Sequence, residues 1–231
     1  TLDSMFTIAH EMGHALHSYH SIKHQPPCNA HYVIFVAEVA STCNEVLLMR
    51  HLLRKSTDRR ERAYLINHFL DQFKGTVYRQ TMFAEFEREL GRMAERGETL
   101  TADALDEKYL ALNRLYFGPD MISDAQIALE WARIPHFYYN YYVFQYATGF
   151  SAAVALADRI LREGEPAVAD YKRFLSGGSS IHVQCSRLHF RGKHAHFRPL
   201  RQRAWLVVKH IGGEQVAHMH RNPQPAGSLV G

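Results

Sequence analysis

The sequence predicts a mainly α-helical fold of several helices with little or no sheet. Apolar residues recur at three- and four-residue spacing through most of the first 180 residues. Capping residues and Gly or Pro breakers separate these segments, and the alternation of strands with helices that marks a parallel sheet is absent. With 231 residues, of which 46% are hydrophobic, the chain can bury one good core.

The first predicted helix lies at the amino terminus and carries the most informative motif. Residues 2–9 have apolar side chains at helical spacing, with Asp3 or Ser4 as the N-cap. The motif H-E-x-x-H follows at residues 10–14. Gly13 inside it costs about 1 kcal/mol relative to Ala in a helix. We therefore expect another backbone or a ligand to approach this face of the helix closely.

Further helices are predicted along the chain. They are 32–54, 60–96, one that begins at Thr101 or Asp103 and ends before Gly118, 149–162, and a short one that opens at Pro166. The segment 60–96 is long or kinked at Gly75, and Gly97 breaks it.

The H-E-x-x-H motif predicts a zinc site. Two imidazoles four residues apart, His10 and His14, can bind one Zn²⁺ from the same face of a helix. Glu11 can then act as the general base toward a water molecule at the metal. Zinc needs a third protein ligand, and Glu38 is the best candidate because it lies in the apolar stretch 33–40, where an unpaired carboxylate would be costly to bury.

Glu45 is a candidate for a supporting role behind the metal ligands. It follows Glu38 by seven residues and therefore shares its helix face, from which it could orient a ligand imidazole. An ordinary helix salt bridge is the alternative for either glutamate.

An aromatic segment at residues 137–146 is the second candidate region. Seven of its ten residues are Phe or Tyr, which by default indicates core packing. A buried Tyr needs a hydrogen-bond partner, however, so a cluster of Tyr indicates the wall of a polar cleft. A phenol or an imidazole there could donate to the oxyanion of a tetrahedral intermediate.

Three motifs together resemble the M3 family of zinc metallopeptidases, and within it the oligoendopeptidase F group. The motifs are residues 10–17, 35–42, and 134–139 with 146–150, and the resemblance covers residues 1–180. It implies one Zn²⁺ per chain held by His10, His14 and Glu38, with Glu11 as the general base. By the same resemblance, His136 and a Tyr at or near Tyr141 donate to the oxyanion.

The sequence departs from the family pattern at Phe144, where members carry Tyr. Phe cannot donate a hydrogen bond, so one oxyanion donor would be missing and turnover could be lower by about 10²-fold. Tyr142 or Tyr146 could substitute.

The resemblance also implies a substrate class, a partner and a location. Family members cleave short peptides in a deep channel within a longer, largely helical, mostly cytoplasmic protein. Because His10 comes so early, we expect a carboxy-terminal catalytic fragment whose partner is the missing amino-terminal lobe, and we expect it to be poorly active alone. The location of the family members and three unpatterned cysteines, which fit a reducing compartment, predict a cytoplasmic protein. No apolar run is long enough to span a bilayer, so we predict no membrane partner, and the lack of a signal segment is uninformative so close to the start of the sequence.

The composition changes abruptly after Ser180, which divides the chain into a catalytic region (1–180) and a tail (181–231). The tail holds six Arg, two Lys and one Glu, a net charge of +7, and seven of the 16 His. Such a tail could bind nucleic acid or extra metal, or be a disordered extension. We favour a shifted reading frame, because no periodicity or motif continues past the junction.

Two functional hypotheses of different class follow. The first is a zinc-dependent endopeptidase acting on short oligopeptides. The second is an inactive zinc-binding fragment whose basic tail attracts polyanions nonspecifically. The tail has no recognised binding module, so we predict no specific nucleic-acid partner.

Overall fold

The structure is a computed structural model that describes residues 1–139 and 141–179. Its elements are α1 (Leu2–His24), η1 (Pro27–Asn29), α2 (Ile34–Lys55), α3 (Arg59–Phe73), η2 (Lys74–Tyr78), α4 (Arg79–Glu95), α5 (Ala102–Phe117), η3 (Ala125–Arg133), η4 (Pro135–Tyr138), α6 (Phe144–Glu163) and α7 (Glu165–Leu175). These ranges contain no strand, and none of their helices combines the length and apolar content needed to cross a bilayer. The predicted mainly helical fold is confirmed.

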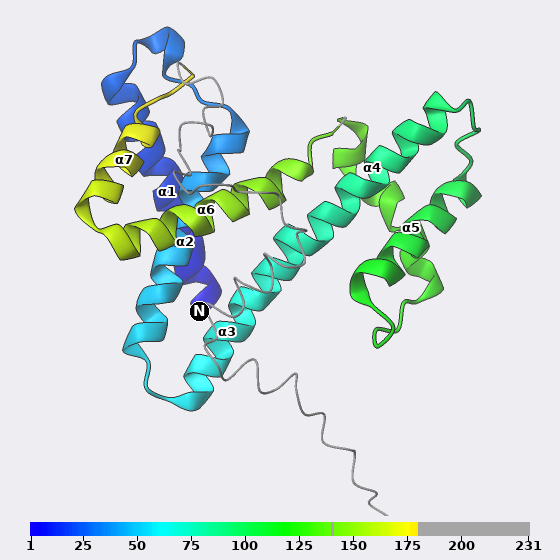
Figure 1. The fold of residues 1–231 in the computed structure, drawn as a ribbon, viewed down its shortest axis with the longest axis horizontal. Helices are drawn as coiled ribbons and strands as arrows, with labels where there is room; N and C mark the ends of the chain where they lie inside the picture. The colour runs from blue at the N-terminus through cyan, green and yellow to red at the C-terminus, as the bar shows by residue number, and fades with distance from the viewer. Residues whose placement is uncertain (140, 180–231) are drawn as a thin grey trace, which may run out of the picture.

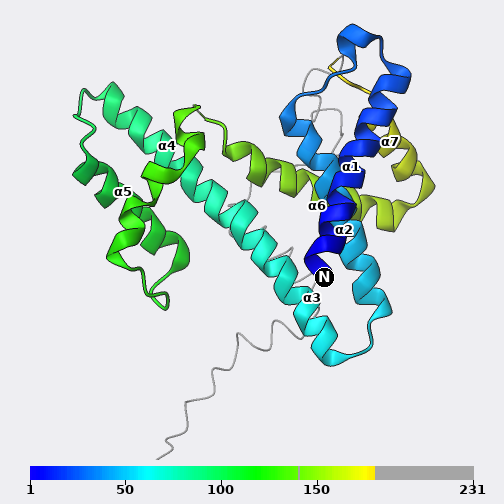
Figure 2. The same cartoon turned by 180° about the vertical axis from the view of Figure 1, so that it is seen from behind.

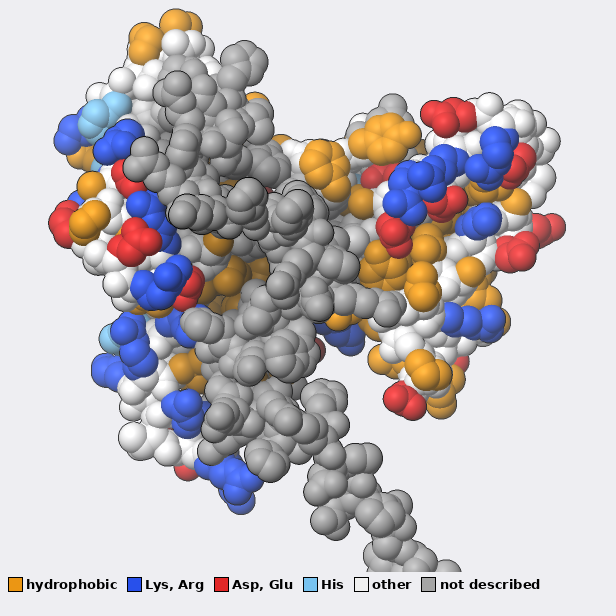
Figure 3. Space-filling view, in the orientation of Figure 1, with side chains coloured by type: hydrophobic (Ala, Val, Ile, Leu, Met, Phe, Trp, Pro, Cys, Tyr) orange, Lys and Arg blue, Asp and Glu red, His pale blue; other side chains and the backbone are white. Residues whose placement is uncertain are grey.

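Two lobes are joined by a long helical rod and by α6, which runs from one lobe into the other (Figures 1 and 2). The larger lobe packs α1, α2, α3, α6 and α7 around one apolar core, and the smaller lobe packs α4, α5, η3 and η4 around another. The rod runs through α3, the π-helical turn η2 and α4. On the lobe of α4 and α5, charged side chains of both signs alternate with apolar ones (Figure 3).

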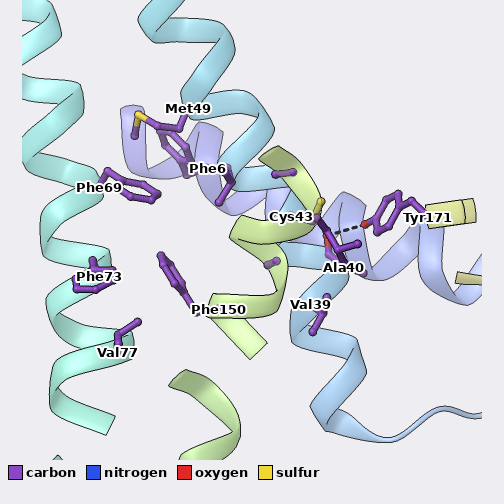
Figure 4. Close-up of a cluster of buried hydrophobic side chains, with 14 of the residues drawn as sticks. Phe6, Val39, Ala40, Cys43, Met49, Phe69, Phe73, Val77, Phe150 and Tyr171 are labelled. Carbon is purple, nitrogen blue, oxygen red and sulfur yellow. Dashed lines mark hydrogen bonds between the residues drawn. The ribbon is translucent and has the colours of Figure 1, made fainter. Parts of the chain in front are cut away.

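The core of the larger lobe fixes α2, which carries Glu38. Phe150 of α6 lies between Phe69 and Phe73 of α3, with ring centroids 5.9 Å from each (Figure 4). On the other side, the Tyr171 hydroxyl of α7 donates to the Ala40 carbonyl of α2 at 3.3 Å. Val39, Cys43 and Met49 of α2 are buried in the same core, so core packing and the hydrogen bond from α7 together fix the position of α2.

The helix boundaries agree with the predictions except at two ends. The Thr101 side chain caps α5, as predicted, and the π-helical turn η2 replaces the kink predicted at Gly75. The N-cap of α1 is Thr1, whose hydroxyl accepts from the Ser4 amide, so the prediction of Asp3 or Ser4 was wrong. Helix α6 begins at Phe144, five residues earlier than predicted, because the aromatic segment supplies its first turn.

His17 of α1 makes the stability of the fold sensitive to acid. It is 1% exposed, stacks on Tyr32 with ring centroids 3.6 Å apart, and burial lowers its pKa to about 4. An unfolded His has a pKa near 6.5, so below that pH the unfolded chain binds a proton that the folded chain does not. Stability is therefore lost as the pH falls from 6.5 toward 4.

We expect this histidine to account for about 2 kcal/mol of the stability lost between pH 7 and pH 5. Urea unfolding of the chain and of His17→Phe at both pH values measures it. The His17→Phe chain should lose less stability on acidification, whereas the exposed His51→Phe control should behave like the unchanged chain. Equal losses in all three would contradict a buried neutral His17.

Candidate metal centre and its aromatic neighbours

The two motif histidines face each other on α1. His10 and His14 are one turn apart, and their Nε2 atoms are 3.2 Å from each other. Tetrahedral zinc with Zn–N distances of about 2.0–2.1 Å separates two ligand nitrogens by about 3.3 Å. The spacing of the imidazoles therefore fits a single ion.

Helix α2 brings Glu38 to the same place. Its Oε2 lies 3.6 Å from His10 Nε2, and its Oε1 lies 4.0 Å from His14 Nε2. The three donor atoms all lie within 4.8 Å of one another. Two imidazoles and one carboxylate form a donor set typical of a catalytic zinc, and the partial exposure of all three side chains leaves room for water.

Gly13 allows α1 and α2 to approach this closely. A Cβ atom at this position would lie 2.4 Å from Ser41 Cα and 2.8 Å from the Ala40 carbonyl oxygen, both in the α2 backbone. The predicted close approach at Gly13 is therefore confirmed, and the approaching group is a backbone. Asn44 of α2 also donates to the Ala9 carbonyl at 3.2 Å, which fixes the register of the two helices.

Glu45 orients the His10 imidazole. Its Oε1 lies 2.6 Å from His10 Nδ1, and its other oxygen accepts a hydrogen bond from Gln72 of α3. This hydrogen bond is the main reason why the pKa of His10 is raised. A proton held at Nδ1 leaves the lone pair of Nε2 free to face the metal position. Nothing in the sequence pattern pointed to Gln72.

Replacing Glu45 with Ala is expected to weaken zinc binding by 10- to 100-fold, roughly, because His10 loses its fixed orientation. A competition titration with a chromogenic chelator measures the change. Glu107→Ala, at an exposed position on α5, is the matched control and should bind zinc as the unchanged chain does. Equal zinc affinity in the two variants would show that Glu45 does not support the metal site.

Glu11 lies on α1 between the two histidines, with an exposed side chain. A helix turns by about 100° per residue, so the Glu11 side chain projects beside the His14 position and away from the packed face of α1. It is therefore free to contact water or a ligand in front of the metal position.

A second group of polar side chains surrounds His136 of η4. The Tyr146 hydroxyl lies 3.2 Å from His136 Nε2, and the Tyr142 and His136 ring centroids are 5.4 Å apart. Burial is the main cause that raises the pKa of Tyr146 to about 12, and Tyr142 and the charge of Glu38 raise it further. Tyr146 therefore feels the charge of Glu38, one of the three candidate metal ligands.

Tyr141 faces a different neighbour. Its backbone has a φ of 49°, and its amide donates to Glu87 Oε1 of α4 at 2.9 Å. Its hydroxyl lies over Gly91, where a Cβ atom would come within 2.7 Å of it. Glu87 is buried, and burial raises its pKa. The described contacts of Tyr141 are thus with α4, and Phe144 is exposed at the start of α6.

The helical fold and the two-histidine, one-glutamate donor set on an H-E-x-x-H helix define a metallopeptidase type of site. The chain belongs to Peptidase family M3, whose family model matches residues 1–202. This family consists of zinc-dependent peptidases. The predicted resemblance to the M3 family is confirmed.

The similar proteins include ones named oligopeptidase or oligoendopeptidase F. The chain is 56% identical over 179 residues to Oligopeptidase PepF of Bacillus subtilis (strain 168), a match that covers 78% of this chain and 27% of the relative. It is 47% identical over 182 residues to the chromosomal Oligoendopeptidase F of Lactococcus lactis subsp. cremoris, and this match covers 79% of this chain and 30% of the relative. The crystal structure of oligoendopeptidase-F from Enterococcus faecium matches with a TM-score of 0.68 and 51% identity. This match covers 77% of this chain and 32% of the crystal structure's chain. The predicted similarity to the oligoendopeptidase F group is confirmed, and the chain spans about a third or less of these relatives.

The predicted division at residue 180 is not resolved by these matches. The family model reaches residue 202, which is farther along the chain than the predicted end of the resemblance. Residues 180–231 lie outside the described part of the structure. The boundary, and the origin proposed for the basic His-rich tail 181–231, stay predictions.

Proposed function

We propose that this chain is the zinc-binding catalytic part of an endopeptidase that hydrolyses peptide bonds of short oligopeptides. The observation that carries the proposal is the pair of Nε2 atoms of His10 and His14, 3.2 Å apart, with the Glu38 carboxylate facing both. The names of the relatives, Oligopeptidase and Oligoendopeptidase F, indicate the substrate class.

His10, His14 and Glu38 would hold the ion, and Glu45 would keep His10 in the required orientation. When bound, Zn²⁺ supplies a Lewis acid that polarises the scissile carbonyl and lowers the pKa of the attacking water toward neutrality. Glu11 accepts a proton from that water and passes it to the departing amine. The net reaction is the addition of water across the peptide bond, and no residue of the chain becomes covalently attached to the substrate.

His136 and Tyr146 are proposed to donate hydrogen bonds to the oxyanion that forms on the attacked carbonyl. Their side chains contact each other, the charge of Glu38 acts on Tyr146, and the raised pKa of Tyr146 keeps its phenol protonated as a donor at neutral pH. In this arrangement Tyr146 takes the role for which the sequence suggested Tyr141, and it supplies a donor that Phe144 cannot.

Tyr146→Phe is expected to lower kcat by about 10²-fold with little change in KM, because an oxyanion donor acts mainly in the transition state. Tyr141→Phe is the matched control, since it removes a hydroxyl that lies over Gly91. Steady-state kinetics on a fluorogenic peptide measure both. A larger loss of kcat in Tyr141→Phe than in Tyr146→Phe would assign the role to Tyr141 instead.

The partner is proposed to be the lobe that corresponds to the rest of the relatives' length. Matches cover only 27–32% of each relative, so a large part of an M3 peptidase has no counterpart in this chain. That lobe would complete the substrate channel and position the peptide, which contributes much of an enzyme's rate. A cytoplasmic location stays a prediction.

A quenched fluorescent peptide assay tests the proposal. The zinc-loaded chain should cleave the peptide slowly, a chelator should stop cleavage, and added Zn²⁺ should restore it. If the unchanged chain binds one zinc but shows no chelator-sensitive cleavage even with the remaining lobe added, the proposal is wrong and the chain is an inactive zinc-binding fragment.

A further inference from the structure

Glu87 of α4 is a buried carboxylate that no cation neutralises in the described part of the chain. Its residue exposure is only 7%, and none of the ion pairs among residues 1–139 and 141–179 includes it. Glu130, the other buried carboxylate in these ranges, is paired with both Arg79 and Arg133. A carboxylate that is buried without a cation is costly for the fold, and such groups gather at functional sites. The contacts of Glu87 therefore point to a role other than stability.

The one described hydrogen bond of Glu87 comes from the backbone of Tyr141. The Tyr141 amide donates to Glu87 Oε1 at 2.9 Å. Tyr141 has a φ of 49°, and it is the only residue other than Gly with a positive φ in the described ranges. Side chains of L-residues rarely adopt this conformation, and it persists only where the surrounding structure holds it. Glu87 therefore holds the connection between η4 and α6 in a turn that Tyr would otherwise avoid.

The connection follows one face of α4. Phe83, Glu87 and Gly91 are spaced four residues apart and therefore share this face. The Phe83 and Phe137 ring centroids are 5.2 Å apart, Glu87 accepts the Tyr141 amide, and the Tyr141 hydroxyl lies over Gly91. In Figures 1 and 2, α4 passes beside the start of α6. The turn at Tyr141 is thus set against a rigid helix.

The same connection joins the two proposed oxyanion donors. His136 lies directly before Phe137, and Tyr146 lies three residues after Val143, which is 0% exposed in the core of the smaller lobe. Apolar packing therefore anchors the chain on both sides of the turn without help from Glu87. The turn itself decides whether the Tyr146 hydroxyl reaches His136 Nε2, from which it lies 3.2 Å.

We propose that Glu87 is a positioning residue for the peptidase reaction: by accepting the Tyr141 amide, it sets the turn that brings His136 and Tyr146 together as donors to the oxyanion. The inference rests on the proposed function, which gives these two side chains that role. Glu87 acts through the backbone of Tyr141, so the Tyr141 hydroxyl is not needed. A shift of about 1 Å in a group that orients the reaction can lower the rate by about 10²-fold.

Three variants test the inference. Glu87→Leu removes the acceptor, whereas Glu87→Gln keeps an oxygen that can accept the Tyr141 amide. The matched control is Glu85→Leu on the same helix, which removes the acceptor of the Tyr116 hydroxyl of α5, a hydrogen bond in the same lobe that does not involve the connection. Urea unfolding shows whether each variant is folded, and Glu87→Ala replaces Glu87→Leu if the latter is not.

Two measurements on the zinc-loaded chains separate the turn from the chemistry. NMR reports the nuclear Overhauser effect between the His136 and Tyr146 rings and the hydrogen exchange of the Tyr141 amide. Steady-state kinetics on the fluorogenic peptide report kcat and KM separately. The NMR signals do not depend on hydrolysis, so they test the position of the two donors even if the proposed function is wrong.

The unchanged chain, Glu87→Gln and the control should show the ring contact and slow exchange at Tyr141, and Glu87→Leu should lose both. Its kcat should fall roughly 10- to 100-fold with KM almost unchanged, and Glu87→Gln should recover most of that loss. A ring contact or a kcat in Glu87→Leu equal to that of the control overturns the inference. So does a kcat in Glu87→Gln as low as in Glu87→Leu. If no chain cleaves the peptide, the proposed function and the catalytic role of Glu87 are both overturned, and the ring contact alone decides whether Glu87 sets the turn.

Discussion

Replacing Glu11 with Gln is expected to lower turnover by about 10³-fold and to leave zinc affinity almost unchanged. The Gln side chain keeps the shape of Glu, but its amide cannot accept the proton of the attacking water. General-base catalysis raises the rate of such reactions by roughly 10²–10⁴-fold. Glu11 is exposed and is not one of the three donor groups, so its replacement should not disturb the metal.

The measurement pairs peptide hydrolysis with zinc titration on the same samples. Glu107→Gln, an exposed carboxylate on α5, should match the unchanged chain in both assays. Turnover in Glu11→Gln within tenfold of the unchanged chain would exclude this carboxylate as the base. A parallel loss of zinc would instead indicate that Glu11 supports the metal.

Replacing Gly13 with Ala is expected to destabilise the fold by about 2 kcal/mol and to weaken zinc binding. The added methyl group would overlap the backbone at Ser41, which cannot rotate away, so α1 must move from α2. Overpacking of this kind costs about 1–3 kcal/mol, which outweighs the gain of up to about 1 kcal/mol from the better helix propensity of Ala. The movement also separates His10 and His14 from Glu38.

Gly75→Ala is the matched control for this substitution. Nothing lies within 4 Å of a Cβ atom at Gly75, so Ala there should be neutral or slightly stabilising. Urea unfolding and zinc titration measure both variants. If Gly13→Ala proved as stable as the control and bound zinc equally well, the close crossing of α1 and α2 would be wrong.

The candidate metal-ligand set could be proposed from the sequence because each residue carries a local signal. The four-residue spacing of His10 and His14 places both on one helix face, and Glu38 is a carboxylate in an apolar stretch that needs a reason to be buried. Gly13 likewise signalled a close approach in a helix that otherwise avoids Gly. These signals depend only on helical geometry and on the cost of burying charge.

The remaining parts of the site depend on contacts between distant segments, which no local pattern reveals. Gln72 reaches Glu45 only because α3 packs against α2, and Tyr146 meets His136 across the connection between η4 and α6. The contact of Tyr141 with α4 follows from a positive φ that is uncommon for Tyr. The aromatic segment therefore predicted a group of polar side chains but not which hydroxyl meets His136.

X-ray absorption at the zinc edge of the loaded chain tests the central claim most directly, because it reports the number and type of atoms around the ion. One zinc should show two imidazole nitrogens and only oxygen ligands besides, at about 2.0–2.2 Å, and the signal of bound zinc should be lost in Glu38→Ala. A sulfur ligand, or an unchanged spectrum and stoichiometry in Glu38→Ala, would contradict a site built from His10, His14 and Glu38.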